Sequence, residues 1–394
     1  MSAWPIAFDP AVPHRDRLLD AGEMRAALAR ESGQVAAIWR VGKVKYHPGR
    51  DLRVVYRGTS RRGPAIVAAR ARSRVQQTRF STFPYDRRLP QLADLVAPSD
   101  AMRALLAGAW TSSRLAGYAP EKSAVVACLD GNPRRPIAFA KHFASEQEAG
   151  AAFAIATCVA DRFGCSASDC RVPRPLLLAN PRLLILEAAH GDRLSALEET
   201  ALVQATARLG TALAELHASD VPLPHAAERT DDARLEDAAR DIAAACPDLA
   251  EAARALAQAL IATRSAPTGV VPLHGDVHLK NALLDGSRLW LIDFDQAHAG
   301  PAAADLGSFL AALRTEALIG ARTHQRAAAL ANAFLRGYAA VRALPPAAEL
   351  RWHLSAALFA ERARRGVTRL RRNVLVHLAT LLEDADRNLR RGAA

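Results

Sequence analysis

One short segment of the chain concentrates the side chains that could do chemistry. In VPLHGDVHLKNALLDGSRLWLIDFDQAHAG, Asp276 and Asn281 lie on a polar loop, and Asp293 follows two strand-like runs joined by the turn Asp285-Gly286. A tight hairpin folds residue 293 back beside residue 281, so that three oxygen-bearing side chains converge. Phosphoryl transfer needs such a set, with a carboxylate near the acceptor hydroxyl and oxygen ligands for magnesium. The segment therefore predicts Asp276 as the base or orienter and Asn281 and Asp293 as metal ligands.

The spacing of these residues resembles that of a known family. His274-Gly275-Asp276, with His278 and Asn281, followed by Asp293-Phe294-Asp295, is similar to the H-G-D-x-H-x-x-N and D-F-D signatures of the aminoglycoside phosphotransferase and choline kinase-like family. That family is a branch of the protein-kinase-like superfamily. Asp305-Leu306-Gly307 follows at the distance typical of the family. The resemblance extends, more weakly, from about residue 112 to about residue 380.

The resemblance implies ATP and Mg²⁺ as cofactors and assigns a role to each matching residue. Asp276 matches the catalytic aspartate, and Asn281 and Asp293 match the magnesium ligands. Structural roles are expected for His274, for His278 and for Asp305, which would support the catalytic loop.

Lys141 is the candidate for binding the nucleotide phosphates. It lies in PIAFAKHFASEQE, on a predicted strand before a helix that Ser145 caps. The resemblance implies that it pairs with the α- and β-phosphates. Only five of the 52 basic residues are lysines, so a slim ammonium at this position is informative. Its carboxylate partner would be Glu148 or Glu146, and the sequence does not choose between them.

The adenine is expected at the junction of the two lobes, residues 186–191. The resemblance implies backbone contacts from the Glu187 carbonyl and the Ala189 amide, so that the side chains there carry little information. No glycine-rich loop precedes Lys141. Instead GYAPEKSAV stands where such a loop would cover the phosphates, a departure that the family tolerates.

These patterns predict an α+β, two-lobed protein-kinase-like fold. Residues 112–189 alternate as strand, strand, helix, strand, strand, and we expect them to form a small antiparallel-sheet lobe that binds nucleotide. Residues 190–394 are mostly of helical periodicity and form the expected catalytic and acceptor-binding lobe. Residues 1–111 lie outside the family core, and we expect an N-terminal cap or extension.

The N-terminal extension contains a possible duplication. Residues 43–57 predict a β-hairpin around Pro48-Gly49, and residues 118–142 repeat this layout at a constant offset of 72. Chance similarity between two hairpins is the alternative. In the gap-free alignment Ala69 stands opposite Lys141, so the first copy would lack a nucleotide lysine.

Composition excludes several classes of protein. The 394 residues are 50% hydrophobic, but charged residues or histidine interrupt every apolar run before it reaches a membrane span. The N-terminus lacks a signal-peptide pattern. Five cysteines without paired spacing predict free thiols in a reducing cytoplasm, although Cys165 and Cys170 could bridge or bind metal. We therefore expect a cytoplasmic protein with no membrane partner.

The acceptor is expected to be a small molecule with a hydroxyl group, but two charged regions disagree about its charge. Residues 228–251 are rich in acid and could hold an amine, whereas residues 351–394 contain ten arginines against four acids and would repel one. We expect a sugar, an amino sugar or a similar metabolite ahead of an aminoglycoside antibiotic.

Two other classes of function stay open at this point. A catalytically inactive kinase-like protein would bind only nucleotide or a partner. Nucleic-acid binding would use the net charge of +12, but no recognition motif, zinc finger or aromatic platform accompanies that charge.

Overall fold

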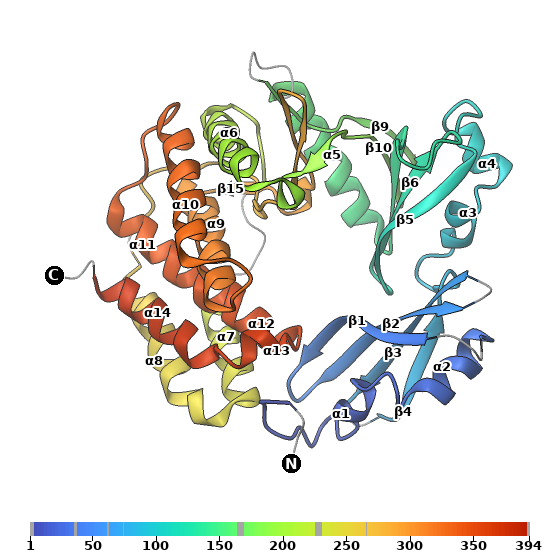
Figure 1. Ribbon diagram of the computed structural model, residues 1–394, viewed down its shortest axis with the longest axis horizontal. Helices are drawn as coiled ribbons and strands as arrows, with labels where there is room; N and C mark the ends of the chain where they lie inside the picture. The colour runs from blue at the N-terminus through green and yellow to red at the C-terminus, as the bar shows by residue number, and fades with distance from the viewer. Residues whose placement is uncertain are drawn as a thin grey trace.

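The computed structural model describes residues 4–34, 38–60, 63–73, 75–163, 169–224, 231–264 and 266–391. The elements follow one another around a ring (Figure 1). An N-terminal sheet leads to a small sheet-containing lobe, which leads to a large helical lobe. The last helices return to the N-terminal sheet and close the ring.

The N-terminal part is a four-stranded antiparallel sheet with short helices. It contains α1 (Arg15–Leu18), α2 (Arg25–Ser32), β1 (Ile38–His47), β2 (Asp51–Ser60), β3 (Gly63–Arg72) and β4 (Val75–Thr82), in the sheet order β1-β2-β3-β4. The predicted hairpin around Pro48-Gly49 is confirmed as β1 and β2. Gly49 closes its turn with φ of +73°, which glycine adopts without strain. Helices α3 (Leu92–Val96) and α4 (Asp100–Ala104) lead to the small lobe.

The small lobe has three strands before its helix, where the sequence predicts two. It contains β5 (Ser112–Ala119), β6 (Ser123–Leu129), β7 (Ala138–Phe143), α5 (Glu146–Arg162), β9 (Pro175–Asn180) and β10 (Leu183–Glu187). The sheet order is β5-β6-β7-β10-β9, with α5 inserted between its third and fourth strands along the chain. Ser145 caps α5 as predicted, because its Oγ accepts a hydrogen bond of 3.3 Å from the Glu148 amide.

Strand pairing in the two sheets can be compared at the offset of 72. Tyr46 pairs with Leu52, and Tyr118 pairs with Ala124, so the first hairpins share their register. The second hairpins differ by one residue. Val125 pairs with Lys141, whereas the equivalent Arg53 pairs with Arg70 and not with Ala69. Arg70 rather than Ala69 therefore holds the place of Lys141, which corrects the gap-free alignment.

The large lobe is mostly helical. Its helices are α6 (Glu199–Ala218), α7 (Asp231–Ala245), α8 (Ala250–Ala262), α9 (Ala302–Leu318), α10 (His324–Ala339), α11 (Ala347–Ala356), α12 (Arg364–Thr368), α13 (Arg372–Leu375) and α14 (Leu378–Arg390). A π-helical turn, η4 (Ala357–Ala363), joins α11 to α12. In the described part of the chain no helix is both long enough and apolar enough to cross a membrane.

Short strands interrupt these helices and carry the predicted site. They are β8 (Cys170–Arg171), β11 (Asp192–Arg193), β12 (Val271–Leu273), β13 (Ala282–Asp285), β14 (Arg288–Leu291) and β15 (His298–Gly300). The predicted hairpin around Asp285-Gly286 is confirmed as β13 and β14. Strand β12 pairs with β15, so the polar loop between β12 and β13 begins and ends on paired strands.

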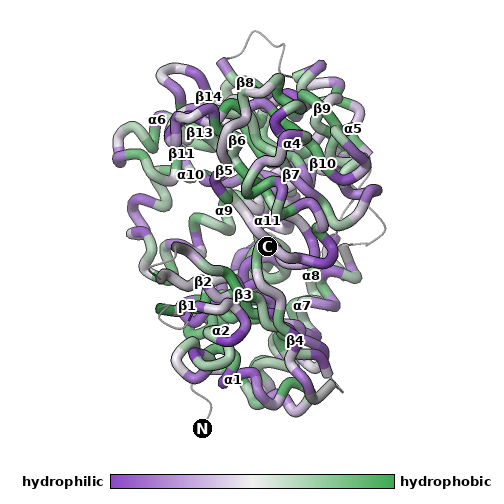
Figure 2. Tube along the Cα trace, turned by 90° about the vertical axis from the view of Figure 1, so that its right-hand side faces the viewer, coloured by the Kyte–Doolittle hydropathy of each residue, from purple (hydrophilic) through white to green (hydrophobic). Residues whose placement is uncertain are grey.

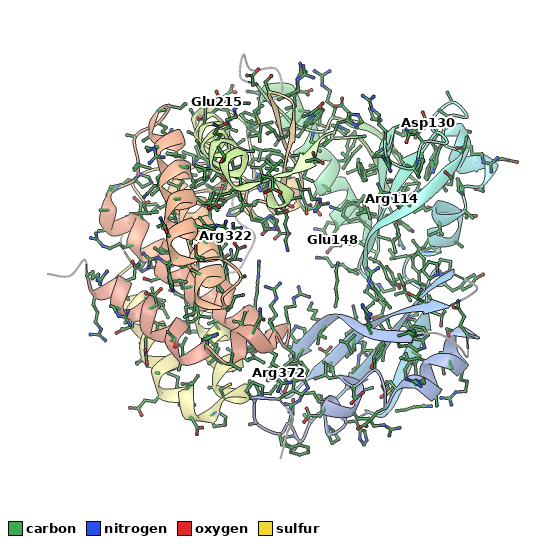
Figure 3. The ribbon with its side chains drawn as sticks, viewed as in Figure 1. Arg114, Asp130, Glu148, Glu215, Arg322 and Arg372 are labelled. Carbon is green, nitrogen blue, oxygen red and sulfur yellow. The ribbon has the colours of Figure 1, made fainter. Side chains whose placement is uncertain are left out.

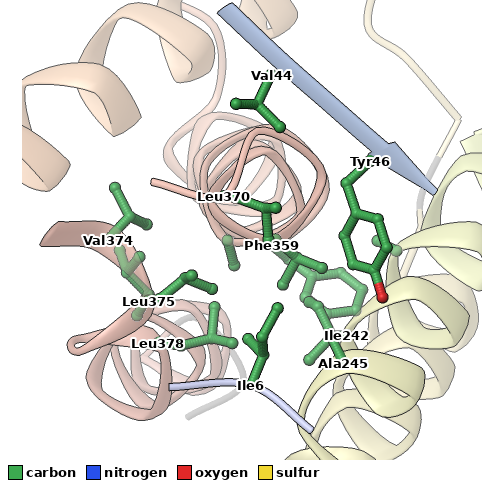
Figure 4. Close-up of a cluster of buried hydrophobic side chains, with 14 of the residues drawn as sticks. Ile6, Val44, Tyr46, Ile242, Ala245, Phe359, Leu370, Val374, Leu375 and Leu378 are labelled. Carbon is green, nitrogen blue, oxygen red and sulfur yellow. The ribbon is translucent and has the colours of Figure 1, made fainter. Parts of the chain in front are cut away.

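One hydrophobic core joins the N-terminal sheet to the C-terminal helices. Val44 and Tyr46 of β1 belong to the same buried cluster as Ile242 of α7, Phe359 of η4 and Leu370 (Figure 4). The perpendicular view shows the N-terminal sheet beside α7 and α8 and below the small lobe (Figure 2). The first and last segments of the chain thus share a core.

A smaller cluster joins the N-terminal sheet to the small lobe. It contains Val55, Ile66 and Ala68 from the sheet and Tyr118 and Ala144 from the small lobe. Because β1–β4 pack on one face against the large lobe and on the other against the small lobe, the N-terminal part bridges the two lobes.

Helices α6 and α10 pack with their backbones in direct contact. A Cβ atom on Gly337 would lie 1.9 Å from the Ala207 carbonyl oxygen, and one on Gly210 would lie 2.0 Å from that of Phe334. Both positions therefore require glycine. The contact matters for the site because α6 carries His217 and α10 carries Tyr338, which hydrogen-bond to each other.

Replacement of Gly337 tests this packing. We expect Gly337→Ala to lower the free energy of unfolding by about 1–3 kcal/mol or more, because the new methyl group overlaps backbone that cannot move easily. Urea denaturation of the two proteins measures the difference. The matched control is Gly150→Ala on α5, where a Cβ meets nothing within 4 Å, and where alanine should stabilise the helix by about 0.5–1 kcal/mol. Equal effects at the two positions would contradict the packing argument.

Candidate functional site

The loop between β12 and β13 brings Asp276 and Asn281 together. The Asn281 side chain is 7% exposed, and its Nδ2 donates to the Asp276 carbonyl at 3.1 Å and to Asp276 Oδ2 at 3.5 Å. Both contacts use the amide nitrogen of Asn281, so neither of them occupies its amide oxygen. His278 Nε2 lies 3.7 Å from Asp276 Oδ2. Asp276, Asn281 and His278 thus form one polar group, as the spacing predicts.

Asp293 reaches this group through the β13–β14 hairpin. Ala282 pairs with Leu291, and the Ile292 amide donates to the Asn281 carbonyl at 3.0 Å. Asp293 itself has φ of 69° and ψ of 60°, a left-handed conformation that is rare outside glycine and common at functional sites. The hairpin therefore folds residue 293 back beside residue 281.

Lys141 connects the small lobe to this hairpin. Its Nζ lies 3.5 Å from Asp293 Oδ1 and makes a closer ion pair with Asp295 Oδ2. The lysine side chain is 12% exposed, and Asp293 is 48% exposed. These ion pairs thus connect strand β7 of the small lobe to the Asp293–Asp295 turn of the large lobe.

The predicted carboxylate partners of Lys141 lie elsewhere. Glu146 pairs with Arg182 at 3.3 Å. Glu148 is exposed and lies at the inner rim of the ring (Figure 3). Neither of these two residues pairs with Lys141, contrary to the prediction, because the Lys141 ammonium pairs with Asp293 and Asp295 instead. The sequence placed Asp295 within the motif but gave no signal of this contact.

Asp305 holds the start of the β12–β13 loop in place. Its two carboxylate oxygens accept hydrogen bonds from the backbone amides of His274 at 2.8 Å and Gly275 at 2.9 Å. His217 Nε2 lies 3.2 Å from the same carboxylate, and His217 Nδ1 lies 2.9 Å from the Tyr338 hydroxyl. Sequence reasoning predicted the role of Asp305 but missed His217, which lies in a helix with no motif around it.

The electrostatics of this buried group are consistent with a charged aspartate. Burial by itself would raise the pKa of Asp305, but the hydrogen bond and charge of His217 and the His274 amide outweigh burial and hold that pKa below its ordinary value. Burial lowers the pKa of His274. A neutral His274 fits its contacts, because its Nδ1 accepts from the Asp276 amide at 3.3 Å while its Nε2 donates to the Ile292 carbonyl at 3.1 Å. His274 therefore links the Asp276 backbone to the Asp293 turn.

Two glycines allow the close approaches around the loop. A Cβ on Gly275, where φ is +79°, would lie 2.0 Å from the Gln296 carbonyl oxygen. One on Gly191, where φ is +101°, would lie 2.2 Å from that of Leu284. Gly191 ends the lobe junction, and its lack of a side chain lets the backbone of the predicted adenine segment pack directly against β13.

The lobe junction, where the sequence predicts adenine contacts from the Glu187 carbonyl and the Ala189 amide, follows the last strand of the small-lobe sheet. Glu187 ends β10, and its amide donates to the Arg174 carbonyl at 2.8 Å. Among the described residues, no backbone carbonyl accepts a hydrogen bond from the Ala189 amide.

Arg362 is a site residue that the sequence did not single out from its arginine-rich surroundings. It lies in η4, and its Nη2 donates to the Ser308 carbonyl at 3.0 Å. Burial lowers the pKa of Arg362, while the nearby charges of Glu361 and Asp276 raise it. Ser308 lies three residues after Asp305 on α9, so Arg362 contacts the helix that supports the β12–β13 loop. The π-helical turn is the structural signal, since such turns are frequent at functional sites.

The donor set suits Mg²⁺ more than a transition metal. Asn281 and Asp293 offer oxygen atoms only, which magnesium prefers. Among the described residues no cluster of three or more histidine, cysteine, aspartate or glutamate side chains could hold a metal ion. Cys128, Cys158 and Cys246 are free thiols as predicted, and Cys165, the possible partner of Cys170, lies outside the described residues.

Comparison with known proteins agrees with the geometry. A family model described as the phosphotransferase enzyme family matches residues 45–350. The chain belongs to this family. The matched range begins inside β1, upstream of Ser112, where the sequence predicts the nucleotide-binding lobe to begin. No curated protein matches the chain by sequence.

Solved structures of phosphotransferases share the fold. A choline/ethanolamine kinase family protein from Mesorhizobium loti is 15% identical, with a TM-score of 0.50 over 75% of this chain and 92% of that one. A thermostable mutant of aminoglycoside phosphotransferase APH(4)-Ia is 15% identical, with a TM-score of 0.51 over 72% of this chain and 96% of that one. Choline kinase from Cryptosporidium parvum Iowa II is 10% identical, with a TM-score of 0.50 over 72% of this chain and 90% of that one. The predicted two-lobed kinase-like fold is confirmed.

The role of Asp305 leads to a prediction about pH. A depressed pKa in the folded state means that the charged carboxylate stabilises the fold above about pH 4, and that this contribution is lost as the pH falls through the folded-state pKa. We expect Asp305→Asn to lower the free energy of unfolding at pH 7 by about 1.5–3 kcal/mol, the value of a hydrogen bond to a charged group. The deficit should shrink below pH 4, as urea denaturation at several pH values measures.

The exposed Asp161 of α5 provides the control for this experiment. Asp161→Asn should change the stability by no more than about 0.5 kcal/mol at any of these pH values. A deficit of Asp305→Asn that stays constant from pH 7 to pH 3 would contradict the assigned charge.

Proposed function

We propose that this phosphotransferase moves the γ-phosphate of ATP to a hydroxyl group of a small molecule such as a sugar or an amino sugar. The observation that carries the proposal is the convergence of Asp276, Asn281 and Asp293 on one side of Lys141. Family membership supports a phosphotransferase. We also propose the roles of the individual residues and the class of the acceptor.

Each residue contributes a separate task. Asp276 orients the acceptor hydroxyl and takes its proton. The acceptor oxygen bonds to the γ-phosphorus as the bond from that phosphorus to the bridging oxygen breaks, and ADP leaves with the bonding electrons. Lys141 pairs with the α- and β-phosphates, and the Glu187 carbonyl and Ala189 amide contact the adenine.

Asn281 and Asp293 are the residues that would hold Mg²⁺. When bound, the ion neutralises charge on the phosphate oxygens. Lys141 pairs with Asp293 and Asp295 in this structure. Nucleotide binding therefore requires this ion pair to break, because the phosphates would bind the same ammonium. If Asp293 held Mg²⁺, its carboxylate would be neutralised without Lys141, and the Lys141 ammonium would be available to the phosphates.

The remaining residues position these groups. His274 holds the Asp276 amide, Asp305 holds the amides of His274 and Gly275, and His278 packs beside the Asp276 carboxylate. Glu148 is exposed at the inner rim of the ring, and we assign it no ion pair with Lys141. An inactive kinase-like protein is the alternative function, and the next experiment separates it from the enzyme.

Substitution of Asp276 tests the transfer step. We expect purified protein with ATP and Mg²⁺ to phosphorylate at least one acceptor in a screen of sugars, amino sugars, amino alcohols and aminoglycosides. Asp276→Asn should lower kcat by about 10²- to 10⁴-fold, because it removes the base, and should leave ATP binding intact. ADP release and direct detection of the phosphorylated product measure the rate. A wild-type protein that binds ATP but transfers nothing to any acceptor would instead be the inactive form.

Substitution of Lys141 tests the nucleotide site. Lys141→Ala should raise the Kd for ATP with Mg²⁺ by about 10- to 100-fold, since it removes a charge-assisted contact worth about 1.5–3 kcal/mol. Calorimetry measures the affinity without requiring an acceptor. Arg135→Ala, in the exposed loop before β7, is the control and should bind ATP normally. Unchanged affinity in Lys141→Ala would contradict the assignment.

A further inference from the structure

The N-terminal sheet holds the turn between β5 and β6 by ion pairs. Residues 120–122 form this turn, and the side chain of Glu121 at its centre is only 19% exposed. Glu121 Oε2 accepts hydrogen bonds from Arg53 Nη2 at 2.7 Å and from Arg70 Nη1 at 2.6 Å. We call these three residues, Glu121, Arg53 and Arg70, the turn clamp. The clamp joins strands β2 and β3 of the N-terminal sheet to the small lobe.

Alternation along the strands directs both arginines toward the small lobe. Arg53 and Arg70 pair directly across β2 and β3, and successive side chains of a strand point to opposite faces. Arg53 therefore shares a face with Val55, and Arg70 shares it with Ala68. Val55 and Ala68 are buried in one cluster with Tyr118 of β5. The apolar part of this face thus packs against the small lobe, and the arginines border it at the turn.

The Glu121 carboxylate offsets the repulsion between the two arginines. Like charges directly opposite each other destabilise a sheet, and here one carboxylate oxygen binds both guanidinium groups. Arg53 Nη1 also donates to the Pro120 carbonyl. Arg70 Nη2 lies 3.2 Å from Asp51 Oδ2. Contact with the turn therefore stabilises the arginine pair as well as the turn.

The backbone of Glu121 adopts a conformation that usually belongs to glycine. The Lys122 amide donates to the Ala119 carbonyl at 3.0 Å and closes the turn. Glu121 follows a proline and has φ of 58°, which are features of a type II turn, whose third position favours glycine or asparagine. The Glu121 amide donates to Asp86 Oδ2 at 2.7 Å. The chain thus keeps a charged side chain where glycine would fit without strain, and that side chain binds the two arginines.

The turn lies at the end of the sheet toward which Lys141 extends. Lys141 pairs with Val125, and Phe143 pairs with Ser123, the first residue after the turn. Lys141 Nζ lies 5.3 Å from the centroid of the Phe143 ring, so the ammonium extends along β7 toward the turn. Figure 1 shows this end of β5 and β6 directed at the N-terminal sheet. The turn therefore borders the space beside the ammonium that we propose for the phosphates.

Arg70 holds the place in the N-terminal sheet that Lys141 holds in the small lobe. Arg70 pairs with Arg53, and Lys141 pairs with Val125, which is 72 residues after Arg53. The side chain at this place is basic in both sheets. In the small lobe we propose that it binds phosphates, whereas in the N-terminal sheet it binds the Glu121 carboxylate. The N-terminal sheet thus binds an anion of its own chain, which suits a supporting role.

We infer that the turn clamp positions the β5–β6 turn over the phosphates of ATP, so that Arg53, Arg70 and Glu121 are positioning residues of the nucleotide site. This inference rests on the proposed phosphotransferase function. A turn that is already fixed in its binding geometry loses less conformational freedom when the nucleotide binds. The clamp also gives residues 1–111 a task, since their sheet supplies both arginines.

Calorimetry with ATP and Mg²⁺ tests the clamp without an acceptor. Glu121→Gln keeps the size of the side chain and removes the charge that both arginines bind. We expect the Kd for ATP to rise by about 10-fold, the effect of lowering the binding-competent population of the turn to about a tenth. Arg57→Ala, an exposed arginine of β2 outside the clamp, is the matched control and should bind ATP normally. Unchanged affinity in Glu121→Gln would overturn the inference.

Exchange of the two charges provides a rescue. Arg53→Glu alone places two carboxylates together, and Glu121→Arg alone places three guanidinium groups together. Each single variant should raise the Kd for ATP by about 10-fold or more. The double variant restores a pair of opposite charges and should return the Kd to within about 3-fold of the wild-type value. A double variant as impaired as the two single variants combined contradicts the assigned contact.

Hydrogen exchange and stability separate positioning from a structural contact. Glu121→Gln should speed amide exchange in residues 118–125 of the nucleotide-free protein by about 10-fold, and a non-hydrolysable ATP analogue with Mg²⁺ should slow exchange there in the wild type. Val55→Ala weakens the apolar part of the same interface and should lower the urea midpoint without changing the Kd for ATP. If Val55→Ala raises that Kd as much as Glu121→Gln does, the contact is structural and the inference is overturned.

The outcomes distinguish this inference from the proposed function. In an active enzyme, Glu121→Gln should raise KM for ATP by about 10-fold and change kcat by no more than about 3-fold, whereas Asp276→Asn lowers kcat. Clamp-dependent ATP affinity without transfer to any acceptor keeps the clamp and overturns the enzyme. Transfer with an unchanged KM for ATP in Glu121→Gln keeps the phosphotransferase and overturns the clamp.

Discussion

The buried carboxylate of Asp305 is the constraint on which the site depends. By accepting the amides of His274 and Gly275 it fixes the first residues of the loop, and His274 then fixes the amide of Asp276 and the carbonyl of Ile292. Asp305 is itself held by His217, at the glycine-lined contact of α6 and α10. A helix packing contact is thus connected through Tyr338, His217, Asp305 and His274 to the backbone of Asp276.

A second constraint is closure of the ring. The N-terminal sheet shares one core with the C-terminal helices and another with the small lobe, so it contacts both lobes. The helical lobe is held together in a similar way, since Arg362 of η4 donates to the Ser308 carbonyl of α9, the helix that also carries Asp305.

Local patterns predicted the elements well. The alternation in residues 43–57, the cap at Ser145 and the turn at Asp285-Gly286 each specify structure within a few residues, and each prediction is confirmed. The convergence of Asp276, Asn281 and Asp293 was predictable because a two-stranded hairpin determines it. Contacts between distant segments were not. The Lys141 pair with Asp295, the role of His217 and the core around Leu370 depend on how whole lobes pack, and the one-residue register shift at Arg70 is invisible in a gap-free alignment.

The central claim is that Asp276, Asn281, Asp293 and Lys141 surround the phosphates of a bound nucleotide. A crystal structure with Mg²⁺ and a non-hydrolysable ATP analogue tests it most directly. We expect the metal to contact the Asn281 amide oxygen and the Asp293 carboxylate, the terminal phosphate to face Asp276, and Lys141 to leave Asp295 for the phosphates. A nucleotide bound outside the two lobes, or a metal that touches neither Asn281 nor Asp293, would contradict the account.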